Sequence, residues 1–140
     1  PISSIDECIL PPINQVASMF FNRQVVDKNY GGLAFEEEGK RCADLLSNPK
    51  KHTFIMGNHG ILMFGQNVAE TFNRLFYFER AAKIYVQALQ TGKTLSILDD
   101  IIAEKTAQEL ENEEYPNPVG TAFLREIKLI LDQEKSDYSQ

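Results

Sequence analysis

The strongest pattern in the chain is a pair of short apolar runs separated by a polar break. Residues 54–56 and 61–64 are apolar, and between them stands Gly57-Asn58-His59-Gly60. Runs this short that are apolar on both faces are typical of central strands covered by helices. Asparagine and glycine tolerate the positive φ of a tight turn. The stretch from Thr53 to Gly65 therefore predicts a β-hairpin.

The residues after the hairpin predict the longest helix of the chain. Asn67 and Glu70 have the spacing of an N-cap and the third helical residue, and Gly92 is a typical helix stop. Between them an apolar stripe recurs at helical spacing, formed by Val68, Phe72, Leu75, Ala82, Val86 and Leu89. Helix and hairpin together are expected to form the centre of the fold.

Glu79 occupies the position that is missing from this stripe. A carboxylate on a buried helix face needs a hydrogen-bond partner or a cation, because an unpaired buried charge is costly. One interpretation is a catalytic or supporting carboxylate beneath the hairpin. The other is a structural carboxylate whose oxygens are satisfied by neighbouring backbone or side-chain groups.

Weaker patterns predict the remaining elements. The first ten residues have no clear period and are expected to form an edge strand or an extended lead-in. The other predictions are a helix over 12–20, a strand over 24–26, a helix over Phe35–Leu46, a helix from the capping pair Ser96 and Asp99 to Leu110, and a last helix starting at Asn117-Pro118.

His59 is the main candidate for chemistry. A histidine fixed between two strands suits a metal ligand or a general base, since both need the imidazole in one orientation. On spacing alone a simple turn residue is the favoured interpretation, because a zinc site needs at least three protein ligands. The second histidine, His52, follows two lysines and is expected to be exposed. Glu36, Glu37 and Glu38 indicate helix electrostatics, because consecutive helical side chains diverge.

Composition restricts the class of protein. A chain of 140 residues with 43% hydrophobic residues is long enough for one domain with a core. A net charge of −6 disfavours nucleic acid as a partner. Cys8 and Cys42 have no CxxC partner and fit a reducing compartment. No apolar stretch reaches the length of a membrane span, so we expect no membrane insertion and a cytoplasmic protein.

The order of motifs resembles the class II aldolase and adducin family. The motifs are Leu10-Pro11-Pro12-Ile13, Gly31-Gly32, Met56-Gly57-Asn58-His59-Gly60-Ile61-Leu62, Ala69-Glu70-Thr71-Phe72 and Phe78-Glu79-Arg80-Ala81. The likeness covers nearly the whole chain, and it matches the later part of the family's domain. It implies an α/β fold, an α/β/α sandwich with a largely antiparallel central sheet. Residues 1–140 would then form a single domain that is N-terminally incomplete relative to the family.

The resemblance also implies a site. Metal-dependent members of the family hold a divalent ion, commonly zinc, with three histidines, two from an upstream His-x-His and one from the His-Gly turn. Only the third has a counterpart here, His59, flanked by the turn residues Asn58 and Gly60. The family's upstream phosphate-binding residues and catalytic carboxylate have none. One imidazole cannot hold the ion in an oriented site, so this chain alone is not expected to retain zinc.

Two classes of function remain open. The chain is either part of a metal-dependent carbon–carbon lyase, of aldolase or decarboxylase type on small sugar-phosphate or oxo-acid substrates, and inactive in isolation. Or it is a non-catalytic assembly domain like adducin head domains, or a degenerate remnant. The family implies ring-like homotetramers, so the expected partner is a further copy of the chain or a complementary N-terminal half.

Overall fold

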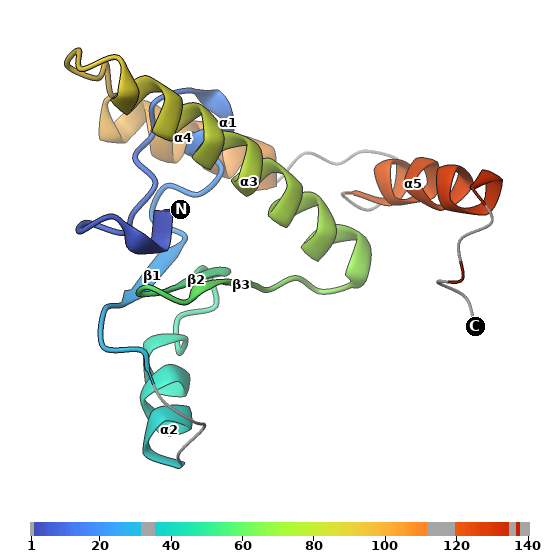
Figure 1. Cartoon of the computed structure of the whole chain (residues 1–140), viewed down its shortest axis with the longest axis horizontal. Helices are drawn as coiled ribbons and strands as arrows, with labels where there is room; N and C mark the ends of the chain where they lie inside the picture. The colour runs from blue at the N-terminus through green and yellow to red at the C-terminus, as the bar shows by residue number, and fades with distance from the viewer. Residues whose placement is uncertain (1, 32–35, 112–119, 135–136, 138–140) are drawn as a thin grey trace.

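The computed structural model describes residues 2–31, 36–111, 120–134 and 137 of the chain (Figure 1). The predicted helix starts at Phe35 and at Asn117-Pro118 lie outside the described residues. The elements are η1 (Ile2–Ser4), α1 (Gln15–Ser18), β1 (Gln24–Asp27), α2 (Glu36–Leu45), β2 (Thr53–Met56), β3 (Gly60–Met63), α3 (Val68–Gln90), α4 (Asp100–Glu111) and α5 (Thr121–Gln133). This mixture of helices and strands confirms the α/β class.

A three-stranded sheet in the order β1-β2-β3 lies at the centre. β2 and β3 form the predicted antiparallel hairpin, with Thr53 opposite Met63 and Met56 opposite Gly60. β1 pairs with the other side of β2 and runs parallel to it, with Gln24 opposite Thr53. The described sheet is therefore mixed, because the connection through α2 brings the chain back to start β2 at the same end as β1.

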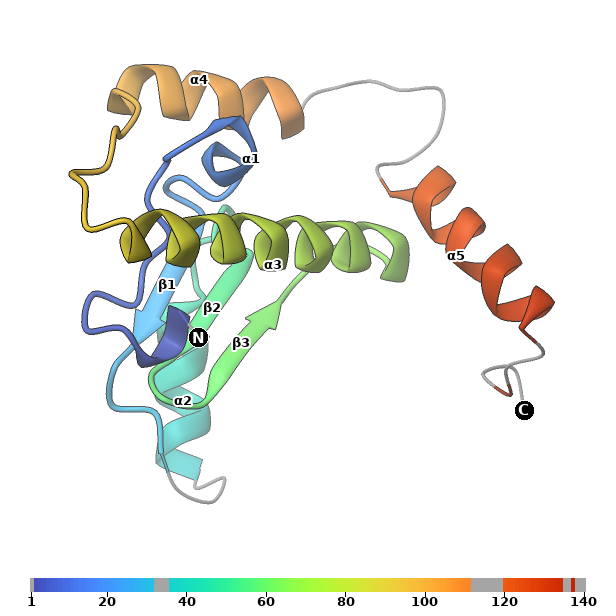
Figure 2. The same cartoon turned by 45° about the horizontal axis from the view of Figure 1, so that its top comes forward.

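Helices lie on both sides of this sheet. Figure 1 shows α2 on one side and α1, α3 and α4 on the other. Turned by 45°, Figure 2 shows α3 passing in front of the strands, with α1 and α4 beyond it. This layering is that of the expected α/β/α sandwich.

The core lies between the sheet and the layer of α1 and α3. Phe20 and Phe78 are almost fully buried, and their rings meet edge to face with centroids 5.0 Å apart. The other buried members of the cluster are Ile2, Cys8, Leu10, Ala17, Ile55, Met63, Ala81, Ala82 and Tyr85. Segments from η1 to α3 thus contribute to one core.

α3 turns a different face to the core than the sequence pattern predicted. Its buried residues are Asn73, Phe78, Ala81, Ala82 and Tyr85. Val68, Leu75 and Leu89, which belong to the predicted stripe, are exposed. Apolar residues occur around most of this helix, so periodicity alone does not select the buried face. The face with two adjacent alanines is buried, and small side chains suit the close approach of α1, which packs on α3.

The two ends of α3 follow the predicted caps. The Asn67 side chain accepts a hydrogen bond from the Glu70 backbone N–H at 3.0 Å. Gly92 has φ +67°, the left-handed conformation that glycine adopts readily after a helix. The predicted capping pair Ser96 and Asp99 is wrong at α4, which begins at Asp100: Asp99 and not Ser96 caps it, and the Asp99 carboxylate accepts from the Ile101 backbone N–H at 2.9 Å.

The N-terminal part departs from the predictions. In place of an edge strand or extended lead-in, the chain forms the short 3-10 helix η1, and Ile2 is only 3% exposed. α1 is shorter than the predicted helix over 12–20, because Asn14 caps it by accepting from the Ala17 backbone N–H at 2.8 Å. Burial of an apolar residue so near the start ties this segment to the core.

An aromatic cluster packs α5 against α3. The ring centroid of Phe123 lies 5.3 Å from that of Phe72 and 4.7 Å from that of Phe76, and both of these residues are on α3. No residue of α5 is buried. None of the helices in the described ranges is long and apolar enough to cross a membrane.

Candidate functional site

The hairpin turn presents His59 on the surface. Asn58 adopts a left-handed φ of +56°, and the His59 backbone N–H donates to the Met56 carbonyl at 3.1 Å. Asn58 and His59 are exposed, and Gly60 is half-buried. The imidazole is therefore accessible, as a metal ligand or a general base requires.

Two backbone hydrogen bonds hold this turn in place. The Asn58 N–H donates to the Ser3 carbonyl at 2.7 Å, and the Gly57 N–H donates to the Asp27 carbonyl at 2.9 Å. A Cβ at position 57 would lie 3.2 Å from that same Asp27 oxygen, so the close approach suits glycine. The backbone that carries His59 is thus fixed to both η1 and the end of β1.

Tyr30 packs against the imidazole of His59. The two ring centroids are 4.9 Å apart, with the planes tilted by 48°, and Tyr30 also meets Phe54 edge-on at 6.4 Å. Nearby, the buried Asp27 pairs with Arg41 of α2 at 2.9 Å. An aromatic neighbour on a braced backbone limits the orientations that the imidazole can take.

The described residues offer one candidate metal ligand, His59, and not a complete metal site. Within residues 2–31, 36–111, 120–134 and 137, no three or more histidine, cysteine or acidic side chains gather where they could hold a metal ion. His59 supplies a single imidazole, whereas zinc takes at least three protein ligands. We therefore derive no catalytic step through a metal from this chain alone.

Glu79 is exposed on α3, which corrects the expectation that it interrupts a buried stripe. It lines a surface groove together with the cations Arg80 and Lys83. The buried residues Phe78 and Ala82 of α3 lie one position before and three positions after Glu79. A carboxylate in this position keeps its hydration and needs no buried partner.

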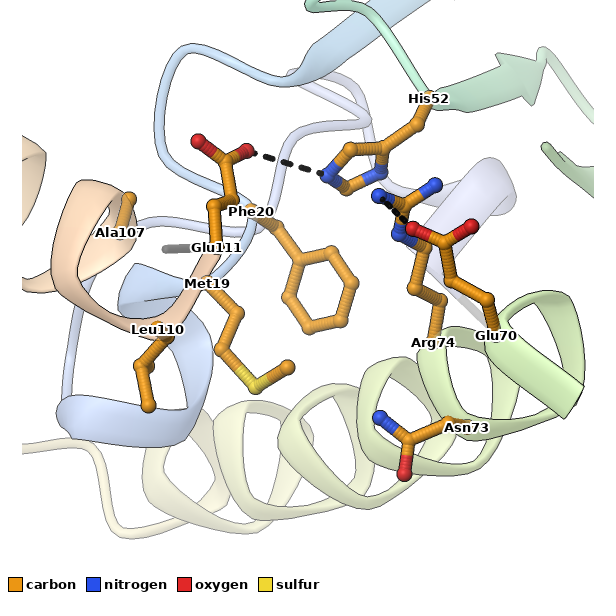
Figure 3. Close-up of a pocket in the computed structure, with 9 residues that line it drawn as sticks. All are labelled: Met19, Phe20, His52, Glu70, Asn73, Arg74, Ala107, Leu110 and Glu111. Carbon is orange, nitrogen blue, oxygen red and sulfur yellow. Dashed lines mark ion pairs between the residues drawn. The ribbon is translucent and has the colours of Figure 1, made fainter. Parts of the chain in front are cut away.

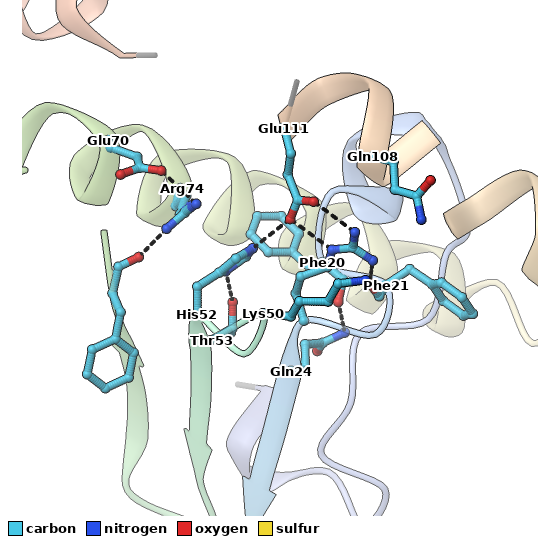
Figure 4. Close-up of polar contacts among 12 residues, drawn as sticks. Phe20, Phe21, Gln24, Lys50, His52, Thr53, Glu70, Arg74, Gln108 and Glu111 are labelled. Carbon is cyan, nitrogen blue, oxygen red and sulfur yellow. Dashed lines mark hydrogen bonds and ion pairs between the residues drawn. The ribbon is translucent and has the colours of Figure 1, made fainter. Parts of the chain in front are cut away.

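A second polar cluster lies at the end of the sheet opposite to the hairpin turn (Figure 4). Arg23, directly before β1, has a fully buried side chain. Its Nε and Nη2 donate to the two carboxylate oxygens of Glu111 at 2.9 and 2.8 Å, and its Nη1 donates to Glu104 at 2.6 Å. These hydrogen bonds lower the pKa of Glu111 and bring the pKa of Glu104 to about 2. Arg23 thereby joins the start of β1 to α4.

His52 belongs to this cluster, and the expectation that it is exposed is wrong. Its side chain is 8% exposed, and its ring meets Phe20 edge to face at 6.0 Å. Burial lowers its pKa to about 4, and the nearby positive charge of Arg74 acts in the same direction. The imidazole is therefore neutral at pH 7. Its burial depends on α3 and α4, which its sequence neighbours do not reveal.

One sequence signal for this cluster exists. Glu104 and Glu111 are seven residues apart, so both lie on one face of a helix, and the buried small residues Ala103 and Ala107 mark that face. Carboxylates beside a buried stripe need a cation, and Arg23 stands between apolar residues before a strand. The spacing does not predict that Arg23 pairs with Glu111, because the two residues are 88 positions apart in the sequence.

The family of this chain follows from a comparison with family models. The family described as "Class II Aldolase and Adducin N-terminal domain" matches residues 2–86, which is more than half of the chain and includes the whole hairpin. The chain belongs to the class II aldolase and adducin family. This confirms the resemblance drawn from the hairpin and helix motifs. No curated protein sequence matches the chain closely.

Solved structures confirm the class II aldolase fold. An aldolase II superfamily protein from Pseudomonas syringae is similar with a TM-score of 0.84 and 22% identity, over 99% of this chain and 54% of that one. An L-fuculose 1-phosphate aldolase from Glaciozyma antarctica PI12 is similar with a TM-score of 0.73 and 19% identity, over 97% of this chain and 50% of that one. The chain spans about half the length of both structures.

Proposed function

We propose that this class II aldolase-family chain contributes one ligand to the divalent-metal site of a carbon–carbon lyase, of aldolase or decarboxylase type. The observation that carries the proposal is an exposed histidine, His59, on a braced hairpin turn within a chain of this family. Small sugar phosphates and oxo-acids are the proposed substrates, and the likeness to an L-fuculose 1-phosphate aldolase makes a sugar phosphate the first to test.

When bound, a divalent ion such as zinc would polarise a carbonyl or enediolate oxygen of the substrate. In this chain, His59 would occupy one coordination position, Tyr30 would limit its rotation, and Asn58 and Gly60 would shape the turn. The other imidazoles would come from a His-x-His on a complementary N-terminal half or on another copy of the chain. We place this assembly in the cytoplasm, where the two free cysteines would stay reduced.

The second candidate is a non-catalytic assembly domain of the adducin kind. A remnant without activity would give the same result in tests of zinc binding and substrate cleavage. The second candidate is favoured by the fact that the described residues alone do not gather a set of metal ligands. In that case His59 is only a turn residue, and Glu79 only a solvated helix charge. The two candidates differ in what happens when the missing ligands are supplied.

The first test therefore combines this chain with a family polypeptide that carries the His-x-His half. We expect the chain alone to bind zinc weakly and to leave L-fuculose 1-phosphate intact, because one ligand does not form a closed site. The mixture should hold stoichiometric zinc by elemental analysis and cleave the substrate. His59→Ala should remove both gains, and Tyr30→Phe, which keeps the ring next to His59, should retain them.

Two results would contradict the catalytic proposal. One is stoichiometric zinc in the chain alone that survives His59→Ala. The other is a mixture that gains neither zinc nor activity although sedimentation shows the two polypeptides associated, which would favour the assembly domain. Circular dichroism of His59→Ala serves as the control, since an exposed turn residue should leave the fold intact.

A further inference from the structure

α3 has a second apolar side that lies outside the core. The side that carries Phe78 is buried, and Figure 3 shows Arg74 of the same helix directed towards His52. Phe76, in contrast, is 41% exposed although its ring meets that of Phe123 on α5. Exposed apolar surface beside charged groups is typical of interaction sites. This side of α3 is therefore a candidate contact surface.

A surface groove with a volume of about 650 Å³ follows this side of the helix. Its lining residues that recur at helical spacing form what we call the outer face, namely Phe76, Glu79, Lys83, Val86, Gln87 and Gln90. Phe76 and Val86 supply apolar contact area. Glu79 and Lys83 place opposite charges between them. A partner therefore has to match both the apolar residues and the charges.

The outer face is complementary to itself. Glu79 and Lys83 lie two positions before and two positions after Ala81, and Phe76 and Val86 lie five positions before and after it. A second copy of α3 that runs antiparallel, about a two-fold axis at the level of Ala81, would set Glu79 opposite Lys83. The same operation would set Phe76 opposite Val86. Because such a contact is symmetric, each of these pairs would occur twice.

The charges of Glu79 and Lys83 are available for this contact. Both residues are exposed, and within the described parts of the chain neither forms an ion pair. Glu70 and Arg74 have the same spacing on the same helix and do pair, with 2.7 Å between nitrogen and oxygen. Arg80 lies one turn before Lys83, so both cations would flank Glu79 of the other copy.

We propose that the outer face of α3 binds the outer face of α3 in a second copy of the chain. Charges at equal distances from one point are what a two-fold contact requires, whereas a contact with a different polypeptide has no need of them. The contact requires neither metal nor substrate, so it does not depend on the proposed lyase activity. One pair of helices is at the low end of interface sizes, and we expect a dissociation constant of roughly 10 µM.

Sedimentation of charge-reversed variants of the full chain tests this proposal. Glu79→Lys and Lys83→Glu each set like charges opposite each other twice, so each variant alone should associate about tenfold more weakly than the parent chain. An equimolar mixture of the two variants sets unlike charges opposite each other at both places. The mixture should therefore regain the association of the parent chain, and so should the double variant Glu79→Lys/Lys83→Glu.

The design separates this contact from other effects. Lys105→Glu on α4, at a side chain that is 75% exposed, changes the net charge as much as Lys83→Glu does and should leave association unchanged. Glu79→Lys makes the net charge of −6 less negative, which by itself would favour association. Association through the edge of β3 would be the same in every sample. A mixture that associates no more strongly than either variant alone, or Glu79→Lys that associates like the parent chain, would overturn the proposal.

Discussion

At the scale of single residues, burial of neutral His52 makes stability depend on pH. Its pKa is about 4 in the folded chain and 6.5 when unperturbed. Between these values the unfolded state binds more protons, so stability is fully present above pH 6.5 and is lost as the pH falls towards 4. The ionisable groups around it are Arg23, Arg74 and Glu111.

We expect the free energy of unfolding to fall by about 3 kcal/mol between pH 7 and pH 4 on this account. Urea denaturation at a series of pH values measures it. His52→Gln, which cannot titrate, should flatten the curve between pH 6.5 and 4.5, above the range in which Glu104 and Glu111 are protonated. A slope that persists in His52→Gln would assign the effect to other groups.

Truncating Arg23 should cost more free energy of unfolding than its ion pairs contribute to stability. A buried ion pair is often no more stable than a well-packed apolar replacement, but truncating one partner leaves the other charge buried. Here one guanidinium serves two carboxylates of α4 through three hydrogen bonds. The arrangement specifies how α4 docks on the start of β1 more than it adds stability.

At the scale of elements, the hairpin and α3 could be predicted because their determinants are local. The glycine-bounded apolar runs, the cap at Asn67 and the left-handed Gly92 lie within a few residues of the boundaries they define. The buried face of α3 could not, because apolar residues surround the helix and the choice is made by packing against α1. His52 was misplaced for the same reason, since distant elements cover it.

The corrected face of α3 predicts a contrast between two positions on that helix. Phe78→Ala should destabilise the protein by about 3–5 kcal/mol, because it removes a ring that is 1% exposed and packed on Phe20. Leu75→Ala, at a position 39% exposed, should cost less than about 1 kcal/mol. Urea denaturation of both variants compares them directly. Equal losses would mean that Leu75 is buried as deeply as Phe78 and would contradict the observed difference in exposure.

At the scale of the whole molecule, both edges of the sheet formed by the described residues are open. β2 is the central strand, and within the described residues β1 and β3 each have one neighbour. Leu62 on β3 and Phe64 just after it are 46% and 37% exposed. Unpaired edges with apolar side chains are templates for further strands. The chain also spans about half of the structures it resembles, so much of that fold lies outside it.

We therefore predict that the chain self-associates. Analytical ultracentrifugation at about 20 µM, a concentration at which contacts of ordinary strength are populated, should show species larger than 15.9 kDa. Lys substitution of Leu62, which puts a charge on the exposed edge strand, should shift the distribution towards monomer. Sedimentation as monomer alone would argue against open edges as an association surface.

The link between Arg23 and α4 also constrains the order in which the chain can fold during its synthesis. The residues that form β1, the hairpin and α3 leave the ribosome before Glu104 and Glu111, which are 81 and 88 positions beyond Arg23. Until then the guanidinium has neither of its carboxylate partners, and burying it alone would cost several kcal/mol. The corner of the sheet at the start of β1 therefore stays hydrated in the nascent chain and closes only after α4 has been made.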